Sequence, residues 1–142
     1  MSSLERAVEL AARYHAGQLQ RNGIPYLLHP LHVMEQVESI PAKIVAVLHD
    51  VVEDTPLTLE DLRAEGFNTE VVEAVRLVTK LEDVSYEDYI DALAHNSLAR
   101  TVKLADLRHN IDLTRLDEVR DYDLERARRY HQAILKLEQA GK

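Results

Sequence analysis

The chain has 142 residues, 46% of them hydrophobic and 30% charged, which is the profile of an ordinary globular protein with a sizeable hydrophobic core. Its formal net charge of −8 argues against broad binding to nucleic acid, because that function needs a basic surface. The chain has no cysteine, which excludes disulfides and thiolate chemistry, so any metal site must use histidines and carboxylates.

The first predicted element is a helix over residues 3–16, which has a stripe of apolar side chains and Gly17 as a natural stop. Ser2 and Glu5 have the spacing of a capping box at its start. Glu5 and Glu9 also stand where a signal peptide would need an apolar core, and no later run approaches the roughly 18 apolar residues of a membrane span. We therefore expect a cytoplasmic protein without membrane contact.

The remaining elements are also predicted to be helical. Pro30 and Pro41 suit the first position of a helix, while Thr58 and Ser85 have an aspartate three residues later, as N-cap residues often do. The predicted helices cover residues 30–39, 41–54, 58–66, 69–81, 85–96, 97–116 and 123–139. No strand, repeat or linker is recognisable. We therefore predict an all-α fold, with residues 1–142 forming a single compact bundle of about seven or eight helices.

Four ionisable side chains lie close together in the apolar segment AVLHDVVEDTP, residues 46–56. On a helix, His49 lies one turn from Glu53, and Asp50 lies one turn from Asp54. All four then fall within an arc of roughly 140°. Buried like charges are costly unless a cation or hydrogen bonds compensate them, and a divalent metal would do so. The simpler alternative is an amphipathic helix with a solvated acidic face.

A second segment, PYLLHPLHV, supplies two more histidines. His29 precedes Pro30, which biases its backbone toward an extended form, so we expect it at a loop–helix junction. His32 follows one turn later. One of the two histidines could be a metal ligand, and the alternative is a capping or solvent-exposed histidine.

A third segment, TVKLADLRHN, places Asp106 one turn before Asn110 and one turn after Lys103, among apolar neighbours. A charged aspartate in that setting needs a partner. A salt bridge to Lys103 or Arg108 would satisfy it, and so would a metal ion.

Together, His29, His49, Asp50 and Asp106 form a set of two imidazoles and two carboxylates that suits Mn²⁺, Fe or Zn²⁺. A metal in such a site lowers the pKa of bound water and polarises a phosphoryl oxygen. Glu53, with Asp54 beside it, lies one turn beyond the ligands, where a carboxylate could orient the attacking water or move protons.

The order of these motifs resembles that of the HD-type metal-dependent phosphohydrolases. The segments YHAGQLQRNGIPYLLHPLHV, VLHDVVEDTPLT, VRLVTKL and VKLADLRHN resemble, in order, those of the RelA/SpoT-type alarmone hydrolase domain, over roughly residues 11–113. By length, the small stand-alone form of that domain is the most similar. The resemblance implies a compact HD-domain helical bundle that hydrolyses the 3′-pyrophosphate of (p)ppGpp to GDP or GTP and pyrophosphate.

The resemblance also assigns roles to single positions. It implies one metal ion, usually Mn²⁺ with other divalent ions as alternatives, held by His29, His49, Asp50 and Asp106. Glu53 and Asp54 match the pair that activates or positions the nucleophilic water. Lys80 and Lys103 match basic positions near the phosphates, and Asn110 matches a position near the sugar. Gln18, Arg21 and Tyr26 match the loop that borders the nucleotide pocket. The resemblance therefore assigns substrate binding to Gln18, Arg21, Tyr26, Lys80, Lys103 and Asn110.

Several residues depart from the family pattern, and all of them concern substrate recognition. The pair Gln20–Arg21 stands where the family usually has Arg–Lys, and Leu107–Arg108 reverses the usual order. Asp112 replaces a residue that is often basic. Two alternatives therefore stay open: a phosphatase or phosphodiesterase for a different nucleotide, and a non-catalytic module that senses a nucleotide or metal. Glu53 and Asp54 count against the second alternative. The oligomeric state, a homo-oligomer included, is open.

The remaining aromatic side chains are predicted to be structural. We expect packing rings with hydroxyls at the surface for Tyr86, Tyr89, Tyr122 and Tyr130, and structural or surface positions for His32, His95 and His131. His109 stands next to Asn110, close to the proposed site, and has no assigned role.

Overall fold

A computed structural model of the chain describes residues 3–142, so the capping role predicted for Ser2 lies outside the described residues. Within residues 3–142 the fold consists of α-helices and one short 3₁₀ turn, and the only β-type pairing is an isolated bridge between Leu19 and Pro25. The predicted all-α fold is confirmed. None of the described helices is long and apolar enough to cross a membrane.

Nine α-helices are present in the described part of the chain, one more than the predicted upper number. They are α1 (Leu4–Tyr14), α2 (Leu28–Glu35), α3 (Ile40–Leu48), α4 (Val51–Asp54), α5 (Leu59–Ala64), α6 (Thr69–Val78), α7 (Tyr86–Ala94), α8 (Ser97–Asn110) and α9 (Asp121–Ala140). The 3₁₀ turn η1 spans Leu113–Arg115, between α8 and α9. The extra helix arises because the predicted helix over residues 41–54 is divided into α3 and α4.

Capping residues set several of these boundaries as predicted. The Thr58 and Asp61 side chains form a reciprocal capping box at the start of α5, and the Ser85 hydroxyl accepts a hydrogen bond from the Asp88 N–H at the start of α7. Pro41 is the second residue of α3, one position later than predicted, because the N-cap is Ser39.

Several predicted boundaries were wrong: α2 ends at Glu35 and α6 at Val78, before the predicted residues 39 and 81, and two further boundaries differ. Helix α2 begins at Leu28, so Pro30 is its third residue, a position in the first turn where the missing N–H is tolerated. Helix α8 ends at Asn110 and does not continue to residue 116. The Asp112 carboxylate accepts hydrogen bonds from the Thr114 N–H at 3.0 Å and the Thr114 hydroxyl at 2.5 Å, and such local bonds compete with helix continuation.

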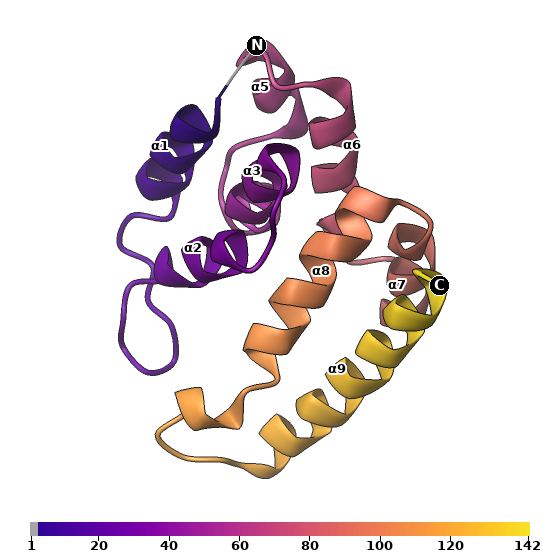
Figure 1. The fold of residues 1–142 in the computed structure, drawn as a ribbon. Coiled ribbons are helices and arrows are strands. Elements are labelled where there is room, and N and C mark those ends of the chain that lie inside the picture. Colours follow the sequence, from indigo (N-terminus) through magenta and orange to yellow (C-terminus); the bar gives the residue numbers. More distant parts are fainter. Residues whose placement is uncertain (1–2) are drawn as a thin grey trace.

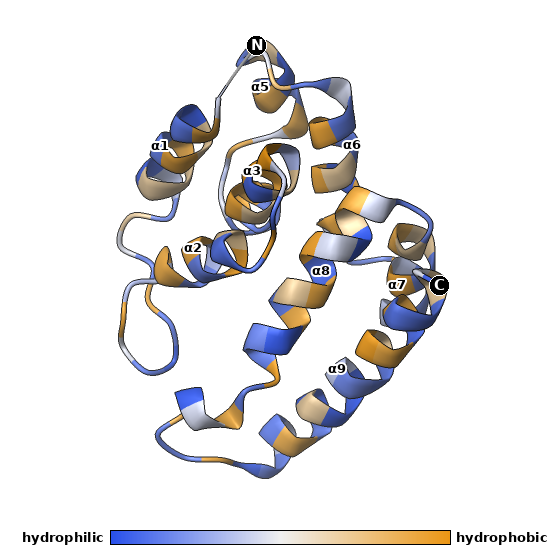
Figure 2. Ribbon diagram, in the orientation of Figure 1, coloured by the Kyte–Doolittle hydropathy of each residue, from blue (hydrophilic) through white to orange (hydrophobic). Residues whose placement is uncertain are grey.

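Helix α3 lies at the centre of the fold. It packs against α1, α2, α6 and α8, and its residues from Ile44 to Leu48 are all buried. Lys43 is the one charged residue of α3, and a helix that is apolar over most of its surface is expected in a core. Figure 1 shows α3 enclosed by these neighbours, and Figure 2 shows the apolar residues of α3 inside the bundle.

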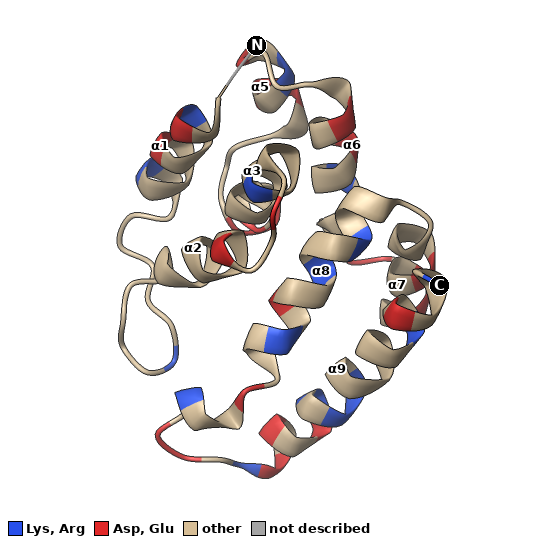
Figure 3. Ribbon diagram, viewed as in Figure 1, with Lys and Arg blue, Asp and Glu red and all other residues tan. Residues whose placement is uncertain are grey.

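Helix α9 is the longest element and packs along α8 and α7. Lys, Arg, Asp and Glu residues alternate along it and along the segment that precedes it (Figure 3). The prediction that Tyr89 places its hydroxyl at the surface was wrong. Helix α7 is covered by α6, α8 and α9, so the buried Tyr89 hydroxyl donates to the Val78 carbonyl oxygen at 2.6 Å. The Tyr86 hydroxyl is also buried, without a hydrogen-bond partner.

Candidate metal centre

The junction between α3 and α4 positions the His–Asp doublet. His49 follows the last residue of α3, Asp50 precedes α4, and both keep φ/ψ angles in the helical region. The Nδ1 atom of His49 donates to the Ala46 carbonyl oxygen at 2.5 Å. Because a carbonyl can only accept, this bond fixes a proton on Nδ1 and turns Nε2 toward the interior of the site.

Three helical segments bring the four predicted ligands together. The Nε2 atom of His29 lies 2.8 Å from Oδ1 of Asp106, and Nε2 of His49 lies 3.2 Å from the same oxygen. Oδ2 of Asp50 lies 3.0 Å from Nε2 of His49 and 4.0 Å from Nε2 of His29. One potential ligand atom from each of His29, His49 and Asp50 falls within 4.8 Å of the others. His29 itself is helical, inside the first turn of α2, so the expected extended backbone was wrong.

The charges of this cluster fit a cation. Burial alone would raise the pKa of Asp50, but His49 lowers it to about 2. Burial also opposes ionisation of Asp106, yet Lys103 and His49 hold its pKa well below the usual range. Both carboxylates therefore stay charged in the interior, and they raise the pKa of His49 above its usual value although burial acts in the opposite direction.

The orientation of His49 supports the same fit. Its Nε2 atom is buried and has no hydrogen-bond partner, because the two nearby carboxylates lack hydrogen-bond alignment. A buried nitrogen without a partner is costly, and a divalent ion that replaced the proton on Nε2 would satisfy it. Two imidazoles and two carboxylates are a suitable donor set for such an ion.

The two oxygens of Asp106 have different partners. Oδ2 accepts from Nζ of Lys103 at 2.9 Å, while Oδ1 faces the two histidines and also accepts from Nδ2 of Asn110 at 2.9 Å. Arg108, the other predicted salt-bridge partner, instead pairs with Glu138. The Lys103 salt bridge therefore leaves Oδ1 directed at the cluster, so the salt bridge and a metal site are compatible.

Glu53 and Asp54 lie on the exposed side of α4, next to the cluster. Oε1 of Glu53 accepts a hydrogen bond from the backbone N–H of Lys80 at 2.8 Å. Partial desolvation, together with the neighbouring Asp50 charge, raises the pKa of Glu53 and also that of Asp54. Both carboxyl groups are thus better proton acceptors than ordinary ones.

Two residues from the loop after α1 contact this region. The Tyr26 hydroxyl donates to Oδ2 of Asp50, which leaves that carboxylate oriented toward the histidines. The Gln18 amide donates to the Asp54 carbonyl oxygen at 3.2 Å, and its oxygen lies 2.8 Å from Nδ1 of the buried His15. Both residues were predicted to border a nucleotide, and here they support the cluster from the side of the loop.

His109, to which the sequence assigned no role, contacts the predicted ligand His29. Its Nδ1 atom lies 2.7 Å from Nδ1 of His29, with the two ring planes only 6° apart. His32 also stacks on His109, with its ring centre 3.8 Å from that of His109. The Nδ1 side of His29 is thus held by a second imidazole, which orients its Nε2 atom toward Asp106.

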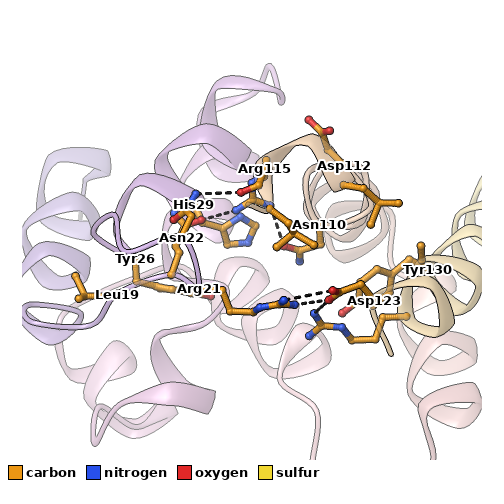
Figure 4. Close-up of a pocket in the computed structure, with 15 residues that line it drawn as sticks. Leu19, Arg21, Asn22, Tyr26, His29, Asn110, Asp112, Arg115, Asp123 and Tyr130 are labelled. Carbon is orange, nitrogen blue, oxygen red and sulfur yellow. Dashed lines mark hydrogen bonds and ion pairs between the residues drawn. The ribbon is translucent and has the colours of Figure 1, made fainter. Parts of the chain in front are cut away.

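A cavity of about 290 Å³ adjoins the cluster at His29 (Figure 4). Three predicted substrate residues line it, namely Arg21, Tyr26 and Asn110. The other three, Gln18, Lys80 and Lys103, lie outside its lining and contact the acidic residues described above. The predicted substrate residues are therefore divided between the cavity and the surroundings of the cluster.

The sequence prediction missed the contribution of α9 and η1 to this cavity. Asp123, Arg126 and Tyr130 line it from one face of α9, and Arg115 lines it from η1. The i, i+3, i+7 spacing of the three α9 residues was a usable signal, because it places them on a single helical face. Figure 4 shows Arg21 reaching toward Asp123.

A helical bundle that gathers a histidine, a His–Asp doublet and a distal aspartate has the arrangement of the HD-type metal-dependent phosphohydrolases. Residues 7–133 match the model of the HD domain family, and the chain belongs to this family.

Curated relatives share this region. The chain is 40% identical to a probable GTP pyrophosphokinase of Mycobacterium leprae, over 78% of this chain and 16% of the relative. It is 36% identical to the guanosine-3′,5′-bis(diphosphate) 3′-pyrophosphohydrolase of Haemophilus influenzae, over 72% of this chain and 17% of the relative. The chain thus spans about a sixth of the length of these relatives.

A solved structure shares the fold. It is a metazoan ortholog of SpoT, reported to hydrolyse ppGpp and to play a role in starvation responses. Its TM-score to this chain is 0.79, with 24% sequence identity, and the match covers 96% of this chain and 85% of that one.

Proposed function

We propose that this chain is a metal-dependent hydrolase that removes the 3′-pyrophosphate of (p)ppGpp. The observation that carries the proposal is the convergence of His29, His49, Asp50 and Asp106 beside a cavity of about 290 Å³. The names of the Haemophilus relative and of the solved SpoT ortholog support this choice of substrate.

In this proposal the four residues hold one divalent ion, with Mn²⁺ as the first choice. Such an ion, when bound, supplies positive charge that activates water and polarises a phosphoryl oxygen. The protein contributes the orientation: Ala46 fixes the ring of His49, and Lys103 occupies only the outer oxygen of Asp106.

Glu53 and Asp54 have the proton-transfer role. The raised pKa of each group means that its carboxylate can take a proton from the attacking water more readily than an ordinary one. The oxygen of that water bonds to phosphorus as the bond from phosphorus to the 3′ oxygen breaks. The 3′ oxygen then acquires a proton, and the products are GDP or GTP and pyrophosphate.

The side chains around the cavity have the positioning role. Arg21, Tyr26 and Asn110 border the space in which the nucleoside would lie, while Gln18, Lys80 and Lys103 support the acidic residues next to the reacting phosphate. A cavity of this volume lies at the lower end of the usual range for small-molecule sites.

Substrate profiling tests the proposal. Purified protein supplied with Mn²⁺ is assayed against ppGpp, pppGpp, nucleoside triphosphates and cyclic nucleotides, with phosphate and pyrophosphate measured separately. We expect release of pyrophosphate from ppGpp and pppGpp alone. Turnover of other nucleotides with ppGpp left intact would contradict the proposal and support the alternative, a phosphohydrolase for another nucleotide.

A further inference from the structure

Three guanidinium groups line the cavity, and two of them share one carboxylate. Arg21 pairs with Asp123, and Nη2 of Arg126 lies 2.9 Å from Oδ1 of the same residue. The Asp123 side chain is only 1% exposed, so it is a buried counter-charge between the loop and α9. Arg21 and Arg126 therefore each have a carboxylate partner before any ligand arrives, and its one negative charge balances one of the two guanidinium charges.

Arg115 differs from both of them. Its Nη1 atom donates to the His109 carbonyl oxygen at 2.8 Å, and its Nη2 atom donates to Oε1 of Gln20 at 2.5 Å. Nη1 also lies 3.4 Å from Oδ1 of Asn110, and all three acceptors are uncharged. Within residues 3–142, no carboxylate oxygen lies within 4.0 Å of the Arg115 nitrogens. The nearby Asp112 carboxylate is instead bonded to Thr114.

The pKa values agree with this difference. Burial lowers the pKa of Arg115, and it outweighs the charges of Asp112 and Asp106, which act in the opposite direction. The hydrogen bond with Asp123 raises the pKa of Arg21. Arginine nevertheless stays charged at neutral pH, so Arg115 presents to the cavity a positive charge that no carboxylate of residues 3–142 contacts.

The surroundings of Arg115 show which ligand group would compensate it. A guanidinium has five N–H donors, so the contacts with His109 and Gln20 leave donors for a ligand. Its planar fork suits a phosphate group. The same cavity is lined by His29 and Asn110, which join it to the metal cluster. A ligand with one phosphate group at the cluster can therefore extend a second one toward Arg115.

We propose that Arg115 is a specificity-determining residue that binds a second phosphate group of the substrate, distinct from the group at the metal cluster. The inference rests on the proposed function, and it defines the substrate class as a nucleotide with phosphates at two positions. Two departures from the family pattern involve Arg115. Gln20 accepts a hydrogen bond from its guanidinium, and Asp112, at a position that is often basic, caps the 3₁₀ turn that contains Arg115.

The experiment compares Arg115→Gln and Arg115→Lys with Arg128→Gln. Arg128 is exposed, pairs with Glu125 at 3.7 Å and does not line the cavity, so it is a matched control for loss of charge. For ppGpp with Mn²⁺, Arg115→Gln should raise KM by on the order of 10-fold to 100-fold, the effect of a lost charge-assisted hydrogen bond. Its kcat should stay within about threefold, because the lost contact is equal in ground and transition states.

Arg115→Lys should raise KM less, because lysine keeps the charge but loses the fork. If thermal melting shows that Arg115→Gln does not fold, the KM of Arg115→Lys is the test of the proposal. A fall in kcat without a change in KM would overturn the proposal, because a merely structural role predicts that result. An equal effect of Arg128→Gln would also overturn it, because the effect would then not be specific to Arg115.

A binding measurement separates this proposal from the proposed function. Calorimetry with GDP and with guanosine reports the phosphate contact without turnover. We expect wild-type protein to bind GDP at least tenfold more tightly than guanosine, and Arg115→Gln to reduce the ratio to about twofold. If ppGpp is not hydrolysed but this ratio depends on Arg115, the proposed function fails and the role of Arg115 stands. An unchanged ratio in Arg115→Gln would overturn that role.

Discussion

The Nε2 atom of His29 lies 2.8 Å from Oδ1 of Asp106, although the two residues are 77 positions apart in the chain. This contact is made where α2 packs against α8, and it brings a histidine and a carboxylate to the same buried point as His49. Lys103 binds the other oxygen of Asp106 and lowers the pKa of this carboxyl group, so Asp106 is charged when it contacts His29.

Loss of one cluster carboxylate should abolish metal binding. Asp50→Asn keeps the shape of the side chain and an acceptor for the Tyr26 hydroxyl, but it removes a charge from the cluster. We expect Mn²⁺ affinity to fall by more than the roughly 10- to 100-fold loss typical of outer-shell changes, and activity to disappear. Calorimetry and elemental analysis measure this. The surface variant Asp91→Asn should bind metal normally, and normal Mn²⁺ binding by Asp50→Asn would exclude Asp50 as a ligand.

Glu53 should affect turnover and not metal content. Its side chain lies on the exposed face of α4 and bonds to the Lys80 backbone, outside the set of potential ligands. Glu53→Gln should therefore retain Mn²⁺ while slowing turnover of ppGpp by about 10²- to 10⁴-fold, the range for lost acid–base help. Rates and metal content are measured on the same sample. Turnover at the wild-type rate would remove Glu53 from the mechanism.

The buried hydroxyl of Tyr89 should contribute to stability. It donates to the Val78 carbonyl oxygen at 2.6 Å, so Tyr89→Phe leaves a buried acceptor without its partner. We expect the free energy of unfolding to fall by about 1–3 kcal/mol in urea titrations. Tyr122→Phe is the matched control, because Tyr122 is 48% exposed, and it should change stability by less than about 0.5 kcal/mol. Equal effects of the two variants would contradict the role of the buried bond.

Asp123 should make the fold sensitive to acid. The hydrogen bond with Arg21 holds the pKa of Asp123 well below its usual range. A depressed pKa in the folded state stabilises the protein above the unfolded value of about 3.9, and this contribution is lost as the pH falls below it. Urea midpoints of wild type should therefore fall more steeply between pH 6 and pH 3 than those of Asp123→Asn. Parallel pH curves would show that the Arg21 pair adds no pH-dependent stability.

Local patterns in the sequence were sufficient for much of the fold. Apolar periodicity located most of the helices, and capping pairs such as Thr58 with Asp61 fixed their starts. The break between α3 and α4 was missed because His49 and Asp50 keep helical backbone angles, so the apolar pattern continues through the junction. The early end of α8 was missed because the side-chain bonds of Asp112 compete with a helical pattern that otherwise runs on.

The candidate metal ligands were predictable because they belong to sequence motifs. The contacts around the cavity were not, because they join residues that are distant in the sequence. Spacing and resemblance selected the four residues that α2, α3 and α8 bring together. The pairing of Arg21 with Asp123 and of Gln20 with Arg115 joins residues more than 90 positions apart, and no local signal indicates it. Only the folded arrangement shows that Arg21 and Arg126 contact a carboxylate, whereas Arg115 contacts none within residues 3–142.

The central claim is that one divalent ion at this cluster enables hydrolysis of ppGpp. The most direct measurement removes metal with a chelator, adds back Mn²⁺ in known amounts, and follows GDP and pyrophosphate released from ppGpp. We expect no turnover without metal, and activity that rises to a plateau at about one Mn²⁺ per chain, with equal amounts of the two products. Turnover that is unaffected by metal removal, or ppGpp that stays intact at the plateau of metal binding, would contradict the claim.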